Sequence, residues 1–291
     1  MDGVLVIDKP QWLTSHDVVN RIRRLAGQKR VGHSGTLDPM ATGVLLVCLG
    51  RATRIAEYLA GSEKTYRARA RLGASTDTQD ATGTVLTERP VAVTCEDVEV
   101  ALGGFRGPIR QVPPMYSALK RQGRALYELA RAGVTVEREA RPVEILALDL
   151  TVCELPEIEF VARCSAGTYV RTLAHDLGER LGCGAHLTAL RREASGNFAA
   201  AGAVPLAELE SEAAAGAWAR HLVPIARALG DWPVLRLDGP AAHKLANGQA
   251  VSWPPDLGGD MACALGPDEE LIGLVRLDRA TGLARPEKIL H

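Results

Sequence analysis

The sequence predicts an α+β fold, with a mixed, largely antiparallel sheet flanked by helices and a small β-rich unit at the C-terminus. Segments typical of strands and helices do not alternate regularly before residue 230, which argues against a doubly wound sheet. Beyond that point, Ala-rich helical sequence gives way to short apolar segments separated by Gly and Pro. The 291 residues, 46% of them apolar, suffice for a large and a small domain. We expect these domains over residues 1–230 and 231–291.

The N-terminal elements can be read in order. Residues 4–8 are typical of a short buried strand. Thr14 or Ser15 can cap a following helix with one apolar stripe, which Gly27 ends. Residues 31–43 contain three glycines and a proline, so we expect an irregular loop there. The continuous apolar run over residues 44–49 then predicts a central strand.

Residues 64–72 alternate strictly between polar and apolar, which predicts a strand with Tyr66 on its apolar face. The arginines at 67, 69 and 71 share the other face, where they contact RNA or form the solvated side of an edge strand. The remaining expected elements are a polar loop at 75–82, a hairpin strand, a helix from Thr94, a basic helix ending at Gly133, strands at 144–153 and 158–164, a helix capped by Thr168 and ended by Gly182, and C-terminal strands at 234–237, 261–265, 271–277 and 288–290.

Charge is unevenly distributed along a chain whose formal net charge is only −1. Residues 18–35 carry five basic side chains and no acidic one, and residues 105–142 carry eight basic against three acidic. Such blocks fit a positive face for nucleic-acid phosphates and ordinary solvated faces about equally well.

Several classes of chemistry leave no trace in the sequence. Phosphate-binding loops, dinucleotide fingerprints, zinc-protease motifs and the deaminase signature are all missing. The six scattered cysteines include no C-x-x-C pair, so we expect reduced core residues and no metal site. There is no signal peptide and no apolar run long enough for a membrane span, so we expect a cytoplasmic protein with no membrane partner. An enzyme of this kind would work with side chains alone, without a cofactor.

The strongest local signal is the glycine-bracketed loop GHSGTLDPMATG over residues 32–43, in which Asp38 precedes a proline. An isolated Asp-Pro is usually only a turn. The whole block, however, resembles the catalytic motif of the TruB family of tRNA pseudouridine synthases, which act on uridine 55 in the T-loop. Trp12 departs from the family, which commonly has Gly at this position, and leaves the conformation of the 9–14 turn open. Further resemblance lies in DKP at 8–10, RLGASTDTQD at 71–80, MYSALK at 115–120, GTYVR at 167–171, DLG at 176–178 and LRR at 190–192.

The resemblance implies a pseudouridine synthase fold with a thumb-like RNA-binding insertion at about 105–142 and a PUA-like domain over 231–291. It also implies that Asp38 is the central catalytic carboxylate, as a nucleophile at C1′, a stabiliser of a cationic sugar, or an aid in removing a sugar proton. Arg171 would be catalytic through an ion pair that orients Asp38, although a surface arginine paired with an acid is the plainer interpretation. Tyr66 would stack on the target uracil and serve as a proton carrier, although its place on the strand also fits a core tyrosine.

Other residues would bind the substrate. Tyr169 and Leu190 would complete the base pocket, each otherwise an ordinary core residue. His33 would contact RNA as the nucleotide is flipped out, although a lone loop histidine is usually just solvated. Lys9 would support the active-site loop.

The resemblance also sets expectations about partners. We expect the T-arm of tRNA as substrate, no guide RNA and a monomer. The alternatives are a guide-RNA-dependent synthase and a tRNA-folding chaperone, and a chaperone would not need the Asp38 carboxylate.

Overall fold

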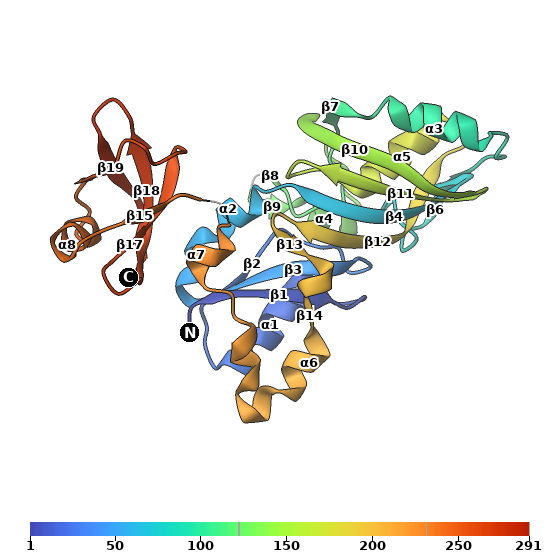
Figure 1. Cartoon of the computed structure of the whole chain (residues 1–291). Helices are drawn as coiled ribbons and strands as arrows, with labels where there is room; N and C mark the ends of the chain where they lie inside the picture. The colour runs from blue at the N-terminus through green and yellow to red at the C-terminus, as the bar shows by residue number, and fades with distance from the viewer. Residues whose placement is uncertain (122, 231, 291) are drawn as a thin grey trace.

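The computed structural model describes residues 1–121, 123–230 and 232–290. Its main feature is a 10-stranded sheet with the path β14-β1-β3-β12-β4-β11-β10-β7, in which β2 pairs with β3 and β13 pairs with β12 (Figure 1). The pairs β1–β14 and β3–β12 are parallel and the others antiparallel, which confirms the predicted mixed, largely antiparallel sheet. Its strands are β1 (Gly3–Lys9), β2 (Val31–Ser34), β3 (Thr42–Leu49), β4 (Lys64–Leu72), β7 (Gly107–Gln111), β10 (Arg141–Glu154), β11 (Glu157–Cys164), β12 (Ala185–Ser195), β13 (Phe198–Ala199) and β14 (Val204–Pro205).

Helices and short hairpins surround this sheet. A two-stranded sheet joins β5 (Ala74–Thr76) to β6 (Val85–Glu88), and another joins β8 (Lys120–Arg121) to β9 (Arg124–Ala125). The α-helices are α1 (Ser15–Ala26), α2 (Ala56–Ala60), α3 (Cys95–Gly103), α4 (Leu126–Arg131), α5 (Val170–Arg180), α6 (Leu206–Ser211), α7 (Ile225–Ala228) and α8 (Gly239–Ala246).

Strand β4 follows the predicted alternation, with Tyr66 on the buried face. It is not an edge strand, because it lies between β12 and β11. Each of its three exposed arginines forms an ion pair with a glutamate of a neighbouring strand. These arginines therefore bridge strands on the solvated face of the sheet.

Two local expectations around the N-terminal helix have different outcomes. Thr14 caps α1 in a capping box with Asp17, and Gly27 ends the helix with a φ of 60°. The expectation of an irregular loop throughout residues 31–43 is wrong, because Val31–Ser34 forms β2 against β3. The ladder with the apolar strand β3 outweighs the glycine content of this short segment.

The expected cap of α5 is also wrong. Tyr169 occupies the N-cap position, and the Thr168 hydroxyl donates instead to the Ser165 carbonyl at 3.0 Å. Strand β12, which follows α5, was not predicted. It pairs with β4 along most of its length, so its mixed polar sequence lies in the middle of the sheet.

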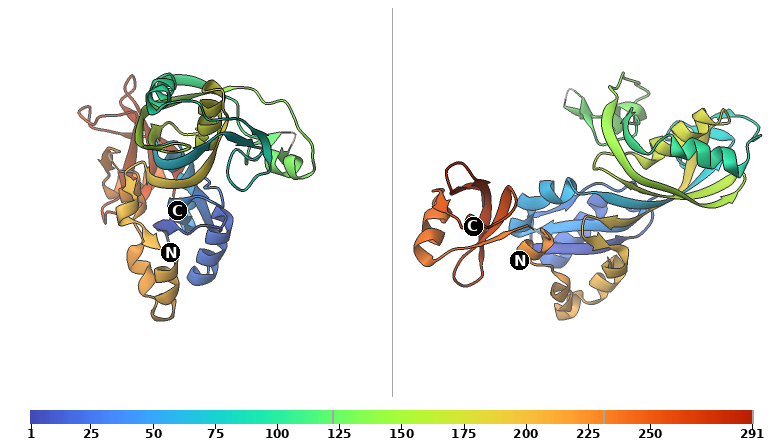
Figure 2. Two further views of the ribbon diagram at one scale, coloured as in Figure 1. Left: turned by 90° about the vertical axis from the view of Figure 1, so that its right-hand side faces the viewer. Right: turned by 45° about the horizontal axis from the view of Figure 1, so that its top comes forward.

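The predicted thumb-like insertion projects from the sheet between β7 and β10 (Figure 2). The basic helix expected within it is only the six residues of α4. Elsewhere in the insertion, the Arg138 guanidinium donates to the Pro113 carbonyl at 3.2 Å.

The cysteines depart from expectation. Cys95 at the start of α3 and Cys153 in β10 form a disulfide, so the prediction that all six are reduced is wrong for this pair. They are 58 residues apart in sequence, a separation that no spacing motif identifies. The other four cysteines are free and buried, as expected.

The C-terminal unit, drawn in orange and red in Figure 1, contains a five-stranded sheet with the order β15-β17-β18-β19-β16. It has its own apolar core, which includes Leu245 of α8, Trp253 and Val275. Its strands are β15 (Val234–Arg236), β16 (Val251–Ser252), β17 (Met261–Leu265), β18 (Leu271–Asp278) and β19 (Leu283–Ile289). A separate sheet and core support the expected boundary near residue 230, which stays a prediction.

This unit also shares a second apolar cluster with the large sheet. Leu274 and Leu290 pack in one cluster with Ile55 and Leu59, and all four are at most 6% exposed. The Arg51 guanidinium donates to the Leu290 carbonyl at 3.0 Å, which adds a polar contact. The C-terminal sheet is therefore docked rather than loosely tethered.

A chain ending at residue 230 should be less stable than the full chain. Loss of Leu274 and Leu290 uncovers the apolar residues beneath them, and burying one leucine contributes about 1.5–3 kcal/mol. We expect thermal unfolding to begin at a clearly lower temperature. An unchanged unfolding temperature would show that the shared cluster contributes nothing, and that the two domains are energetically independent.

Candidate active site

A carboxylate and a guanidinium form the centre of the site. Arg171 in the first turn of α5 donates from Nε to Oδ2 of Asp38 at 2.8 Å and from Nη2 to Oδ1 at 3.1 Å. This two-point contact fixes both carboxylate oxygens in one plane. The Arg171 side chain is 4% exposed, whereas that of Asp38 is 32% exposed. The Asp38 carboxylate is thus bound by the buried Arg171 guanidinium on one side and is accessible on the opposite side.

Arg171 is itself held by groups around it. It donates to the Thr78 carbonyl at 2.8 Å and to the Tyr116 carbonyl at 2.7 Å. The buried carboxylate of Asp80 lies 3.7 Å from Nη1. Because these partners surround the guanidinium, it has one orientation from which to meet Asp38.

The loop that carries Asp38 is tied down on both sides of that residue. The Ser15 hydroxyl accepts from the Leu37 amide at 2.8 Å, and the fully buried Lys9 ammonium donates to the Pro39 carbonyl at 3.3 Å. Lys9 also donates to the carbonyls of Pro10 and Leu13. Burial lowers the pKa of Lys9 to about 8, although the charge of Asp38 acts in the opposite direction. Lys9 therefore joins the turn over residues 10–13 to the loop that carries Asp38.

The open side of Asp38 faces a cavity of about 360 Å³. Four other predicted residues line it: Tyr66 of β4, Tyr169 and Arg171 at the start of α5, and Leu190 of β12. Residues 117–119 of the thumb-like insertion cover part of it. The structure therefore brings five of the seven predicted site residues together, although they come from four separate segments.

Tyr66 lies between apolar and cationic neighbours. Burial raises the pKa of its phenol, and the smaller opposing effect comes from the nearby Arg192 guanidinium. Burial likewise raises the pKa of Tyr169. Both phenols are therefore neutral near pH 7, and both residues line the cavity.

His33 and Lys9 do not line the cavity. His33 is on β2, directly across from Val47 of β3, rather than on a loop. Its side chain is half-buried, and burial lowers the pKa of its imidazole, with smaller contributions from the charges of Arg192 and His16. The ring is thus neutral near pH 7 and lies on the strand that leads into the Asp38 loop.

Arg192, part of the LRR segment, is the main residue of the site to which the sequence analysis assigned no role. It is 1% exposed, lies directly across from Tyr66 in the β4–β12 ladder, and donates to the Val44 carbonyl at 2.6 Å and the Gly35 carbonyl at 3.2 Å. Alternation along a strand would have separated it from Arg191, which pairs with Asp8 on the other face. That signal required β12 to be recognised first. Lys64 and Ser117 also line the cavity and were missed.

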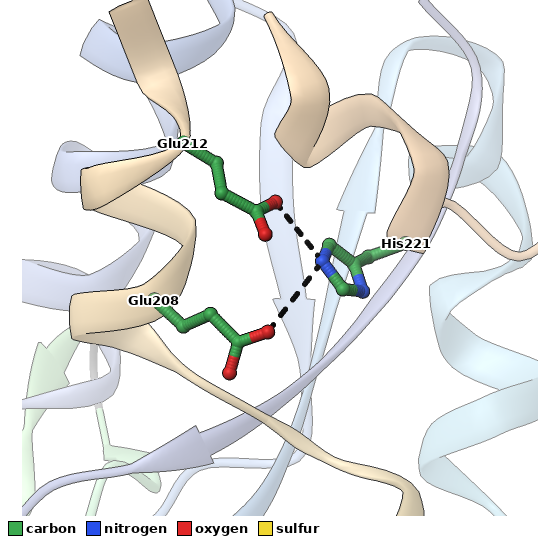
Figure 3. A group of neighbouring side chains, drawn as sticks. All are labelled: Glu208, Glu212 and His221. Atoms are coloured by element: carbon green, nitrogen blue, oxygen red, sulfur yellow. Dashed lines mark hydrogen bonds and ion pairs between the residues drawn. The ribbon is translucent and has the colours of Figure 1, made fainter. Parts of the chain in front are cut away.

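One side-chain cluster has the composition of a metal site. Glu208, Glu212 and His221 bring a ligand atom each within 4.8 Å of one another (Figure 3). His221 Nε2 lies 3.1 Å from Glu212, and Arg220 also pairs with that carboxylate. The prediction of no metal-binding group thus overlooked this set. Existing hydrogen bonds and ion pairs account for it, and none of its members lines the cavity.

Activity should therefore survive exhaustive dialysis against a chelator. The residues around Asp38 are held by one another, and the cavity lining lacks the Cys and His sets that zinc favours. We expect the rate of the reaction at this site to be the same before and after dialysis. Loss of activity that zinc restores would contradict this expectation, and substitution of His221 by alanine would then test the cluster directly.

Family models match most of the chain. The N-terminal domain of the TruB family of pseudouridylate synthases matches residues 23–170, and the C-terminal domain of tRNA pseudouridylate synthase B matches residues 171–230. A tRNA pseudouridine synthase B of Burkholderia lata is 47% identical over all of this chain and 90% of its own length. One from Chromohalobacter salexigens is 46% identical over all of this chain and 95% of its own.

Solved structures agree with this assignment. A Cbf5–Nop10–Gar1 complex contains a chain with a TM-score of 0.75 and 26% identity, covering 99% of this chain and 85% of that one. An H/ACA ribonucleoprotein bound to a substrate RNA containing 2′-deoxyuridine gives a TM-score of 0.74 at 24% identity, over 99% and 85% of the two chains, and supports the fold alone. The family models and the curated relatives place the chain among the pseudouridylate synthases. It belongs to the TruB family of these enzymes.

Proposed function

We propose that this protein converts uridine 55 in the T-loop of tRNA to pseudouridine, with Asp38 as the reacting carboxylate. The observation that carries the proposal is the two-point ion pair that directs the Asp38 carboxylate into an aromatic-lined cavity. Curated relatives at 45–47% identity over the whole chain carry the name tRNA pseudouridine synthase B.

The reaction suits a site built from side chains alone. The C1′–N1 bond breaks, the uracil turns, and a C1′–C5 bond forms while C5 loses a proton and N1 gains one. Atoms and electrons balance within the nucleotide, so no redox partner is consumed. Asp38 attacks C1′, stabilises the cationic sugar or assists a sugar-proton transfer, and each route needs a carboxylate beside the sugar.

The cavity supplies what the detached base requires. The target base must leave its stack to reach Asp38, because this carboxylate lies in the wall of a cavity rather than on an open surface. Tyr66 offers an aromatic face for the uracil and a neutral hydroxyl for proton transfer at C5, while Tyr169 and Leu190 flank the base. Tyr66, Tyr169 and Leu190 belong to the apolar part of the lining and, with the bound base in place, would limit the access of water to C1′.

RNA binding would extend beyond the cavity. His33 would contact the RNA where the flipped nucleotide leaves its stack, and the basic insertion over 105–142 would hold the T-arm. The C-terminal sheet would serve as a PUA-like RNA-binding domain. We propose that the enzyme acts in the cytoplasm as a monomer without a guide RNA. Among helices in the described residues, none is long and apolar enough to cross a membrane.

Incubation with an unmodified T-arm stem-loop and mapping of the product tests the proposal. We expect pseudouridine at the T-loop uridine without any added RNA. A matched stem-loop with cytidine at that position should remain unmodified. The proposal is wrong if the uridine is unchanged, and guide dependence is indicated if modification appears only when a second RNA is supplied.

A further inference from the structure

Trp12 lies in the turn between β1 and α1 and is fixed against the active-site loop. Its amide donates to the Pro39 carbonyl at 2.7 Å, one residue beyond Asp38. The Lys9 ammonium donates to the carbonyls of Pro10 and Leu13, on either side of the turn. The main chain that carries the indole is therefore as well positioned as the catalytic loop itself.

The conformation at this position does not suit a tryptophan. Trp12 has a φ of 69°, in the left-handed region that glycine adopts readily and bulky residues avoid. Strained residues of this kind concentrate at ligand-binding and catalytic sites, where the surrounding structure holds them in place. Trp12 is held in this way by its bond to Pro39.

Packing does not explain the side chain either. Trp12 is 64% exposed, whereas Trp218 and Trp253 are 3% and 8% exposed. The fourth tryptophan, Trp232, is half-buried and packs edge-on against Tyr58 at 5.1 Å between ring centroids. Trp12 thus combines an unfavourable backbone conformation with a largely unused aromatic surface.

The surroundings have the chemistry of a single-stranded RNA site. His16 is exposed in the first turn of α1, four residues along the chain from Trp12. Helix α1 then carries Arg21, which lines a surface hollow together with Pro10 and also pairs with Glu210 at 3.2 Å, and Arg23 and Arg24 follow in its last turn. Aromatic faces beside basic side chains are the usual means by which proteins bind unpaired nucleotides.

We propose that Trp12 is a stacking platform for an unpaired base of the substrate RNA, next to the uridine that enters the cavity. This inference rests on the proposed function. The bound base uses the exposed face of the indole, and the bond from Trp12 to Pro39 sets the position of that base relative to Asp38.

Three substitutions separate stacking from a structural role. Trp12→Gly removes the ring and relieves the backbone strain, and Trp12→Asn keeps a side chain that tolerates this conformation. Trp12→Phe retains an aromatic face and the strain. We expect the Kd for the unmodified T-arm stem-loop to rise about tenfold in the Gly and Asn variants and to stay within about threefold in the Phe variant. KM should follow Kd, kcat should change little, and neither the Gly nor the Asn variant should unfold at a lower temperature.

Tryptophan fluorescence gives an independent measurement. Because Trp12 is the most exposed of the four tryptophans, RNA binding should quench emission in the wild-type chain and much less in Trp12→Gly. The inference is wrong if Trp12→Gly binds RNA as the wild type does, if it is quenched equally, or if Trp12→Phe is as weak as Trp12→Gly. Failure of the wild-type enzyme to modify the stem-loop would instead contradict the proposed function.

Discussion

Asp38→Asn should lower kcat at least about 10⁴-fold, because the amide cannot act as a nucleophile or base or balance a cationic sugar. The amide is nearly the same size as the carboxylate, so the loop held by Ser15, Lys9 and Arg192 should keep its shape. RNA affinity should stay within about tenfold, since phosphate and shape contacts supply most of the binding. Single-turnover assays with the T-arm stem-loop and direct binding titrations measure the two quantities.

Asp149→Asn is a matched control. Asp149 is on β10, its side chain is 68% exposed, and its ion pair with Arg106 is 3.9 Å long. The same chemical change there should leave kcat and Kd unaltered. Substantial turnover by Asp38→Asn would remove Asp38 from the centre of the mechanism. A loss of RNA binding as large as the loss of kcat would mean that the substitution had disturbed the fold.

Much of the fold could be predicted from the periodicity of apolar residues and from the residues that cap helices. The alternation of residues 64–72 identified β4 and placed Tyr66 on its buried face, because a half-buried strand imposes that period directly. The apolar stripe of α1 and the end of this helix at Gly27 could likewise be predicted from the sequence. Strand β12 could not be predicted in this way. It lies in the middle of the sheet, but it carries several charged residues, whose partners are side chains and carbonyls of nearby strands.

The site could be predicted only where the sequence retains a family motif. Asp38 and Arg171 are 133 residues apart, and nothing in their local sequence indicates that they meet. Resemblance supplied that pair, and the structure supplied its geometry. Arg192 had no assigned role because its function is to donate to main-chain carbonyls, which leave no sequence pattern. The pairing of Cys95 with Cys153 could not be predicted either, because it depends on tertiary structure.

Arg171→Lys should reduce kcat strongly while leaving a cation in place. The guanidinium contacts both oxygens of Asp38 and two main-chain carbonyls, and an ammonium cannot reproduce that planar arrangement. The carboxylate would then shift relative to the sugar, and a displacement of about 1 Å in a reacting group can cost about 10²-fold in rate. We expect kcat to fall by about that factor, with KM changing much less. Steady-state kinetics on the T-arm stem-loop measure both.

Arg67→Lys is the matched control for this substitution. Arg67 pairs with Glu159 and Glu193 on the solvated face of β4, one residue from Tyr66 but on the opposite side of the strand. It should retain nearly full activity, because exposed ion pairs contribute at most about 1 kcal/mol and Arg67 does not line the cavity. The two variants should also differ in thermal stability, since Arg171 is buried among its partners and Arg67 is not. If Arg171→Lys also retained nearly full activity, the orientation of Asp38 would not depend on the guanidinium, and the cation would act only through its charge.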